Sequence, residues 1–173
     1  MILFQEFNKY DMSYDILMKV WIEVSSEYRF KKKLAESMSL YAPATMRHLH
    51  MLENVKGGDA ILHYLTAPGT RIKNRRSSII AISKTKSDLQ HSGNKLNISL
   101  EEITNLPSPV SLVDIKALAS KSALLESLLK VNFQRYLGEI DIEDLRNILL
   151  IHPENLHFLN KLKSYENIFP DRE

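Results

Sequence analysis

The sequence has 173 residues, 25% of them charged, no cysteine and a formal net charge of +2. A chain of this length can bury a core of its own, and without cysteine it has neither a disulfide framework nor a thiolate metal site. The first six residues do not resemble a signal peptide, and no apolar run approaches the roughly 20 residues of a membrane helix. We therefore expect a cytoplasmic protein that is not embedded in a membrane.

Positive charge is concentrated in one part of the chain. Residues 29–86 hold 12 Lys and Arg side chains against three acids, whereas residues 139–173 hold four bases against eight acids. A cluster of cations favours approach to phosphates because binding releases counterions from the nucleic acid. The alternative is an ordinary solvated charged face.

Two helices are predicted before residue 40. Ser13 or Asp15 can cap the first, whose apolar face runs through residues 16–24 and includes Trp21. The second covers residues 30–38. Lys31, Lys32 and Lys33 lie at its start, where the helix dipole disfavours cations; a bound phosphate would explain their position, and the alternative is an ordinary solvated face.

A turn at residues 39–41 and a third helix complete a helix-turn-helix pattern. Pro43 suits the first turn of this helix, which we expect to end near Asn54, before Gly57 and Gly58. Residues 60–65 and 77–83 are strand candidates, and between them residues 71–76 form a basic tip. Residues 85–96 are predicted as a short helix.

The last third of the sequence is predicted to be helical. Pro107 and Pro109 indicate a linker or sharp bend. One long helical segment follows over residues 111–137, and further helices run from Asp141 to about residue 151 and from Pro153 to about residue 164. The predicted fold class is mainly α with a small β-hairpin wing, a winged helix-turn-helix at residues 1–106 and a helical dimerisation or interaction region at residues 107–173.

A stretch with a family resemblance lies at the hairpin tip. Residues 74–83, NRRSSIIAIS, resemble the wing signature of MarR-type winged-helix regulators, with Asn74 at the acidic position and Ile82-Ser83 at the Leu-Thr pair. The resemblance covers about residues 13–90. It implies a DNA-binding regulator in which Arg75 or Arg76 enters the minor groove.

The residue types around the third helix also suit DNA. Arg47 can pair with a guanine edge, and Ala44 or the Thr45 methyl can contact a thymine methyl. Tyr41 can meet a phosphate or pack against the first helix, and Thr45 can equally face inward. The predicted DNA-binding residues are Lys31, Lys32, Tyr41, Ala44, Thr45, Arg47, His48, Arg71, Lys73, Arg75 and Arg76.

The sequence carries no signature of an enzyme, a cofactor or a metal site. It lacks the glycine-rich and nucleophile-elbow motifs, and His48 and His50 are two residues apart, which points them apart on a helix. We therefore predict a protein that is not an enzyme and has no cofactor or metal.

The function predicted from these patterns is sequence-specific transcriptional regulation. The helix at residues 43–54 would enter the major groove, and the wing at residues 66–76 would lie on the minor groove and backbone. The expected partners are double-stranded DNA, a second copy of the chain bound through residues after Pro109, and possible small-molecule effectors. The alternatives are a plasmid or phage replication or maintenance factor and a helical protein-interaction module that does not bind DNA.

Overall fold

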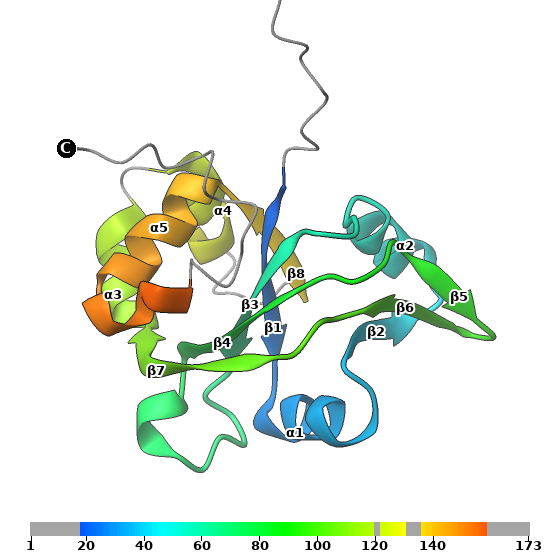
Figure 1. The fold of residues 1–173 in the computed structure, drawn as a ribbon, viewed down its shortest axis with the longest axis horizontal. Helices are drawn as coiled ribbons and strands as arrows, with labels where there is room; N and C mark the ends of the chain where they lie inside the picture. The colour runs from blue at the N-terminus through cyan, green and yellow to red at the C-terminus, as the bar shows by residue number, and fades with distance from the viewer. Residues whose placement is uncertain (1–17, 120–121, 131–135, 159–173) are drawn as a thin grey trace, which may run out of the picture.

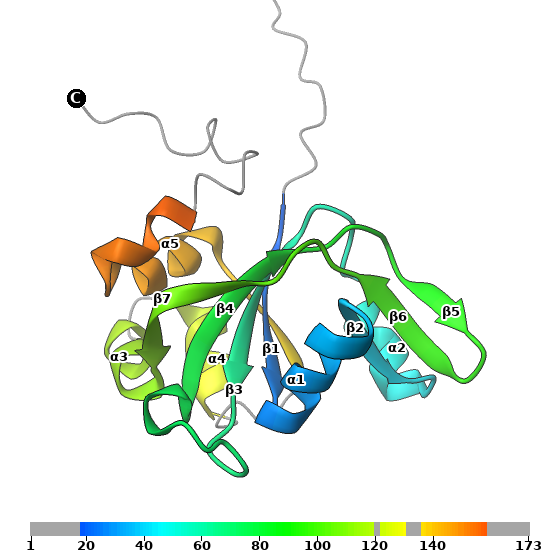
Figure 2. The same ribbon diagram turned by 60° about the horizontal axis from the view of Figure 1, so that its bottom comes forward.

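The computed structural model describes residues 18–119, 122–130 and 136–158, and its strands form two sheets (Figures 1 and 2). A five-stranded sheet has the order β7-β4-β3-β1-β8, and a three-stranded sheet has the order β2-β6-β5. The elements are β1 (Val20–Ser25), α1 (Glu27–Glu36), β2 (Ser39–Pro43), α2 (Met46–Leu52), β3 (Ala60–Leu65), η1 (Lys73–Arg75), β4 (Ser78–Lys84), β5 (Gln90–Ser92), β6 (Lys95–Ser99), β7 (Thr104–Ser111), α3 (Leu112–Leu118), α4 (Ala123–Lys130), β8 (Leu137–Ile140), α5 (Ile142–Leu150) and η3 (Pro153–Asn155).

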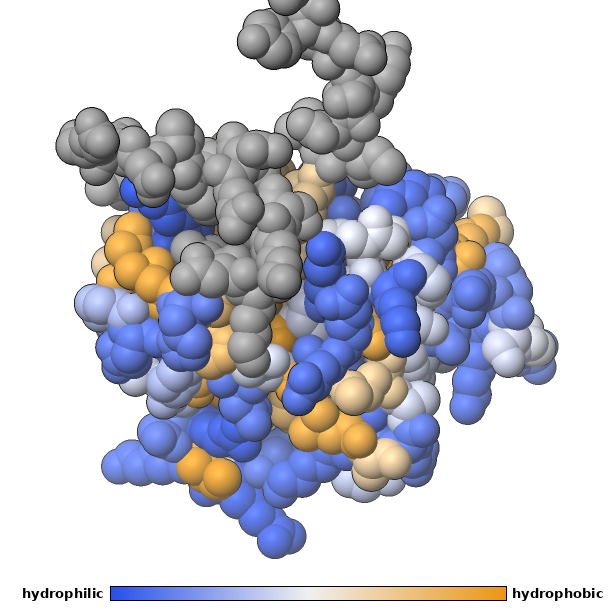
Figure 3. Space-filling view, in the orientation of Figure 1, coloured by the Kyte–Doolittle hydropathy of each residue, from blue (hydrophilic) through white to orange (hydrophobic). Residues whose placement is uncertain are grey.

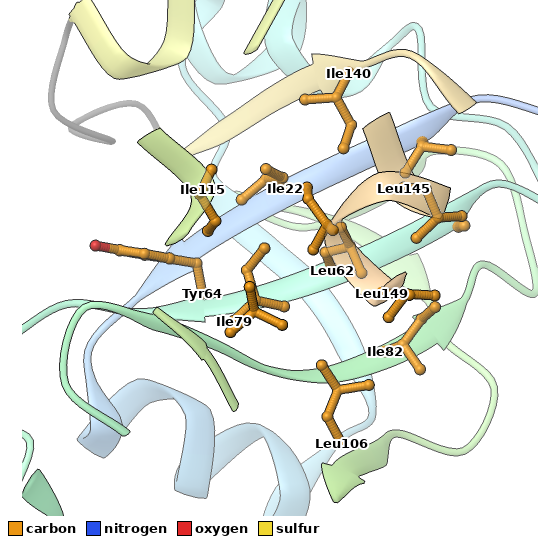
Figure 4. Packing of buried hydrophobic residues seen from close by; sticks show 14 of the residues in the cluster. Ile22, Leu62, Tyr64, Ile79, Ile82, Leu106, Ile115, Ile140, Leu145 and Leu149 are labelled. Carbon is orange, nitrogen blue, oxygen red and sulfur yellow. The ribbon is translucent and has the colours of Figure 1, made fainter. Parts of the chain in front are cut away.

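The larger sheet separates two apolar clusters. Side chains alternate between the faces of a strand, so Ile22 of β1 points to one side and Trp21 to the other. On the first side α3, α4 and α5 cover the sheet, and Ile115 and Leu145 pack there against Ile22 and Leu62 (Figure 4). The second side faces α1 and the smaller sheet.

The second cluster fills the space between the two sheets. Trp21 and Ile61 of the larger sheet share it with Leu40 of β2 and Ile98 of β6. The Trp21 indole donates a hydrogen bond of 2.9 Å to the buried Asp59 carboxylate, so the polar end of this ring is also satisfied. The small sheet is therefore fixed against the inner face of the large one.

The predicted mainly α fold with a winged helix is wrong, and the first helix shows why. Residues 20–25 form the strand β1, which pairs in parallel with β3 and antiparallel with β8. A strand buried on both faces has apolar residues at consecutive positions, and such a run also satisfies a helical spacing. The part of the predicted helix before residue 18 lies outside the described residues.

The predicted helix-turn-helix is also wrong. The predicted second helix is confirmed as α1, but the predicted turn belongs to β2, which pairs with β6. The predicted third helix shrinks to the seven residues of α2. Leu40 and Ala42 are buried while Tyr41 and Pro43 are not, which is the alternation of a strand. Thr45 then caps α2 by accepting a hydrogen bond from the amide of His48.

The two hairpin strands are confirmed, but they do not form a wing. β3 and β4 pair antiparallel in the interior of the large sheet, and all six residues of β3 are buried. The predicted helix at residues 85–96 is instead the β5–β6 hairpin, with Gly93 at φ 56° in its turn. The predicted linker at Pro107 and Pro109 is the strand β7, whose place at the sheet edge tolerates proline.

The predicted helix from Asp141 is confirmed as α5, but the long helix predicted over residues 111–137 is two shorter helices, α3 and α4, and the strand β8 begins at Leu137. The helix predicted from Pro153 begins only as the short 3-10 helix η3. The helices α3, α4 and α5 complete the first cluster. Leu125 and Leu128, cited as part of an apolar excess that a dimer would cover, are buried in that cluster, whereas Leu124 is 39% exposed. Phe133 and the end of the last predicted helix lie outside the described residues. The dimer and the two-region division of the chain stay predictions.

No helix in the described ranges has the length and apolarity needed to cross a membrane.

Candidate functional site: a buried ionic cluster beneath an aromatic pocket

A carboxylate and an imidazole lie side by side within the larger sheet. Glu23 of β1 is 1% exposed and His63 of β3 is fully buried, and the parallel register pairs these two residues directly. The helix α1 begins after the N-cap Ser26 and returns over this face of the sheet, which brings Lys33 to Glu23. Three elements thus place three ionisable groups at one buried point.

The carboxylate of Glu23 accepts hydrogen bonds from three side chains. The Lys33 ammonium contacts both carboxylate oxygens, Nδ1 of His63 lies 2.7 Å from Oε2, and the hydroxyl of Tyr136 lies 3.3 Å from Oε1. Burial alone would raise the pKa of Glu23. The charge of Lys33 and the hydrogen bond from His63 outweigh burial and lower that pKa to about 2, so Glu23 is ionised.

His63 extends this cluster to β4. Burial lowers the pKa of His63 below its usual value of 6.5, and the interactions with Glu23 only partly oppose this effect. A neutral imidazole has one donor, and its hydrogen bond to ionised Glu23 places that proton on Nδ1. Nε2 then accepts a hydrogen bond of 2.8 Å from the hydroxyl of Ser83.

A small pocket opens directly above Glu23 and Lys33. Ser25, Arg29, Tyr41 and Tyr136 complete its lining, and its volume of about 10 Å³ holds roughly one water molecule. The hydroxyl of Ser25 is buried and has no hydrogen-bond partner among the described residues. A buried polar group without a partner is costly, so Ser25 marks a position where a ligand atom would be stabilised.

Two aromatic rings and an arginine form the mouth of this pocket. The guanidinium carbon of the exposed Arg29 lies 5.9 Å from the ring centroid of Tyr41 and 5.8 Å from that of Tyr136. Burial and the negative charge of Glu23 raise the pKa of Tyr136 well above its usual value, so its hydroxyl stays a donor to Glu23. A planar cation therefore lies against both rings.

The predicted basic tip is the loop between β3 and β4. Arg71 and Lys73 are exposed, while Arg75 donates a hydrogen bond of 3.1 Å to Asn105, and Nε of Arg76 donates one of 2.7 Å to the carbonyl of Thr70. The loop occupies the lower left of Figure 1, where the surface is mainly hydrophilic (Figure 3). Its cations therefore face solvent on a loop that is internally hydrogen-bonded.

This loop contacts the start of α1. The amide of Arg71 donates a hydrogen bond of 2.7 Å to the buried carboxylate of Glu27, which also pairs with Lys31 at 2.9 Å. Lys32 lies one position further and reaches Glu36 at 3.8 Å. The basic loop, the lysines of α1 and Arg29 therefore belong to neighbouring elements.

The predicted recognition residues occupy different surroundings. Ala44 and Arg47 are exposed, and Oγ1 of Thr45 lies 2.7 Å from Nδ1 of His48. The ring of His48 meets that of Tyr136 edge-on, with 6.5 Å between centroids. Of the predicted residues, Tyr41 lines the pocket and His48 contacts its aromatic wall.

Several residues of this site were missed by sequence reasoning. Glu23 and His63 carried a usable signal, because each is a polar residue in an otherwise apolar strand. Lys33 was singled out as a cation at the start of a helix, but it pairs with the buried Glu23 and neither meets a phosphate nor lies on a solvated face. Arg29, Ser83 and Tyr136 carried no signal, since their relation to Glu23 depends on how the elements pack.

Sequence comparisons do not assign this chain to a family: no family model matches it, and curated proteins give no significant match. Solved structures do share its fold. A protein of Agrobacterium tumefaciens aligns with a TM-score of 0.56 at 15% identity, covering 75% of this chain and 90% of that one.

Two human structures give similar values. Human THYN1 protein in complex with 5-methylcytosine containing DNA has a TM-score of 0.55 at 10% identity, covering 77% of this chain and 96% of that one. The DUF55 domain of human thymocyte nuclear protein 1 has a TM-score of 0.55 at 11% identity, covering 79% and 98%. The chain therefore has a DUF55-like fold, and the predicted resemblance to MarR-type regulators is wrong.

Proposed function

We propose that this protein binds DNA and holds one unstacked base against the rings of Tyr41 and Tyr136, in the place that the Arg29 guanidinium occupies in this structure, above the small pocket. The observation that carries this proposal is the unpartnered hydroxyl of Ser25 in the lining of a pocket whose mouth is aromatic. A human protein with the same fold has been solved in complex with DNA, which supports the choice of ligand.

The mouth of the pocket suits the flat face of a base. Stacking of one base on an aromatic side chain contributes about 1–3 kcal/mol and tolerates any base. Arg29 is exposed, so its guanidinium can leave the rings of Tyr41 and Tyr136 when a base arrives and then pair with a phosphate.

The floor of the pocket suits the polar edge of a base. Glu23 is ionised and only accepts hydrogen bonds, while the hydroxyl of Ser25 both donates and accepts. A base edge presents donors beside acceptors, so it can supply the partner that Ser25 lacks and still face the acceptor Glu23. The ion pair with Lys33 and the hydrogen bond from His63 hold the Glu23 carboxylate in place. They leave the hydroxyl of Ser25 available to a ligand.

The loop between β3 and β4 would supply phosphate contacts. Arg71, Lys73 and Arg76 are exposed there, beside the start of α1. Phosphate contacts position a protein on a nucleic acid, whereas base contacts select the sequence. In this arrangement the loop supplies affinity and the pocket supplies selection.

We propose binding, and not catalysis, as the role of the polar cluster. Ser83, His63 and Glu23 are hydrogen-bonded in the order of a hydrolase triad, at 2.8 and 2.7 Å. Ser83 is only 4% exposed, however, and its hydroxyl is enclosed within the sheet. The cluster therefore serves best as a rigid support for Glu23.

A role in regulating transcription is a more specific form of this proposal, and it would use the same DNA contact. We do not propose that residues 43–54 enter the major groove, because only the seven residues of α2 are helical there. A replication or maintenance factor would use the same pocket at repeated sites. A protein-interaction module without DNA affinity is the alternative that the following experiment excludes or supports.

The experiment compares Ser25→Ala with Ser127→Ala, a serine exposed on α4. Fluorescence anisotropy measures their affinity for a short single-stranded DNA with cytosine or 5-methylcytosine at its centre. Loss of one ligand hydrogen bond should weaken binding by Ser25→Ala by about 0.5–1.5 kcal/mol, without lowering its melting temperature. Equal affinities of the two variants would contradict the base pocket, and no binding by the wild type at low salt would contradict the DNA role.

A further inference from the structure

A second hollow lies on the outer face of the three-stranded sheet. It has a volume of about 140 Å³ and is enclosed by the end of α1, by β2 and by the β5–β6 hairpin. Tyr41 lines both this hollow and the pocket above Glu23, so the two spaces are adjacent and share one wall. The hollow is too small for a drug-sized ligand and suits a fragment of one nucleotide.

The strand pattern makes the lining of this hollow polar. Leu40 and Ala42 point into the core, so Tyr41 points outward from β2. On the neighbouring strand β6, Asn97 pairs with Tyr41 in the register, and Lys95 lies two residues earlier on the same face. The face therefore presents a ring, an amide and an ammonium group side by side.

Two groups in the hollow lack partners among the residues that the structure describes. The side-chain oxygen of Asn97 is buried without a hydrogen bond, and Lys95 has no carboxylate within 4.0 Å. Lys32, which also lines the hollow, reaches Glu36 only at 3.8 Å and is partly exposed. The hollow thus brings together an acceptor without a donor, Lys95 without a paired carboxylate, and Lys32, whose long contact with Glu36 is made to a carboxylate that also lines the hollow.

We infer that this hollow binds the nucleotide adjacent to the one held at the Tyr136 pocket. The phosphate would lie between Lys32 and Lys95, and an N–H of the base would donate to Asn97. Tyr41 would separate the two nucleotides, with its ring available to both. The inference rests on the proposed function and extends it, because the recognised unit becomes two successive nucleotides of one strand.

The same chemistry also fits a free nucleotide or inorganic phosphate, and chain length distinguishes these sources. Binding of a deoxymononucleotide, a deoxytrinucleotide and inorganic phosphate is measured by calorimetry for the wild type and for Lys95→Ala. Lys116→Ala is the matched control, since Lys116 is exposed on α3, away from the small sheet.

We expect the wild type to bind the trinucleotide more tightly than the mononucleotide. Lys95→Ala should lose about tenfold in affinity for the trinucleotide, the size expected for one charge-assisted phosphate contact, and should leave the mononucleotide unaffected. The slope of log affinity against log salt should fall by about 0.7. Asn97→Ala should reduce trinucleotide affinity without changing that slope.

Three results would overturn the inference. Equal trinucleotide affinities of Lys95→Ala and Lys116→Ala would show that the hollow takes no part in binding. Equal losses on mononucleotide and trinucleotide would place Lys95 at the first nucleotide, and tight, Lys95-dependent binding of inorganic phosphate would make the hollow a simple anion site. In each case the DNA role stands, whereas a wild type that binds neither oligonucleotide refutes both proposals.

Discussion

Lys33 and Glu23 form an ion pair in which each side chain is only 2% exposed, and this pair joins α1 to the central strand β1. Burial of either charge alone would be costly, because the interior cannot replace the water that each group loses. The helix is therefore held to the sheet by a contact that requires both partners.

Lys33→Met should destabilise the protein by about 3–5 kcal/mol, because it leaves the Glu23 carboxylate buried without its cation. Chemical denaturation measures the change in the free energy of unfolding. Lys32→Met, one position along the same helix, replaces a partly exposed lysine and should change that free energy by less than about 1 kcal/mol. A similar loss in both variants would show that the methionine, and not the buried charge, is responsible.

Stability should fall in two stages as the pH is lowered. The folded state holds the pKa of His63 below 6.5, so the unfolded state takes up this proton first, and stability decreases as the pH falls below about 6.5 until the folded pKa is reached. Glu23 titrates at about 2 when folded and near 4.5 when unfolded. It therefore contributes about 3 kcal/mol above pH 4.5 that is lost between pH 4.5 and 2.

Denaturation between pH 3 and 8 tests this dependence. His63→Asn should remove the first stage, although it also lowers stability at pH 7 through the lost hydrogen bonds to Glu23 and Ser83. His91→Asn, at an exposed position of β5, should retain both stages. An unchanged pH profile of His63→Asn above pH 5 would assign the first stage to other groups.

Tyr136→Ala should weaken DNA binding by about 1–3 kcal/mol through loss of base stacking, whereas Tyr136→Phe should retain most of the affinity. The control is Tyr28→Ala, since Tyr28 is 74% exposed on α1. Anisotropy titrations give the affinities and thermal melts report the fold. If Tyr136→Phe binds as weakly as Tyr136→Ala, the hydroxyl contact with Glu23 matters more than stacking.

Substitutions in the β3–β4 loop should separate phosphate binding from loop structure. Lys73→Ala should reduce DNA affinity and leave the melting temperature unchanged. On duplex DNA it should reduce the magnitude of the slope of log affinity against log salt concentration by about 0.9. Arg76→Ala should reduce both affinity and melting temperature, because Arg76 also holds the carbonyl of Thr70. Lys130→Ala on α4 serves as the control, and an unaltered slope for Lys73→Ala would remove the loop from the DNA contact.

Local signals in the sequence predicted several elements correctly. The acidic N-cap Asp141 predicted α5, where the structure shows a full capping box, and the β-branched run at residues 77–83 predicted β4 (Ser78–Lys84). These features depend only on neighbours along the chain. β1 was wrongly predicted as a helix, because consecutive apolar residues fit a buried strand and a helix equally well.

The geometry of the site depends on contacts between residues far apart in the sequence, which local sequence patterns do not predict. Glu23 meets His63 because β1 and β3 are parallel neighbours, although 40 residues separate the two side chains. Tyr136 reaches Glu23 across 113 residues. Tyr41 was predicted from its position beside a supposed turn, and it lines the pocket because β2 turns its side chain outward.

The pairing of β1 with β8 sets an order for biosynthesis. β1 lies between β3 and β8, and Val20 is registered against Ile140, so the first described strand has an open edge until the chain is made through Ile140. An unpaired, apolar strand edge invites association with other chains. Nascent protein halted before β8 should therefore depend on chaperones, and its release into a folded state should follow completion of that strand.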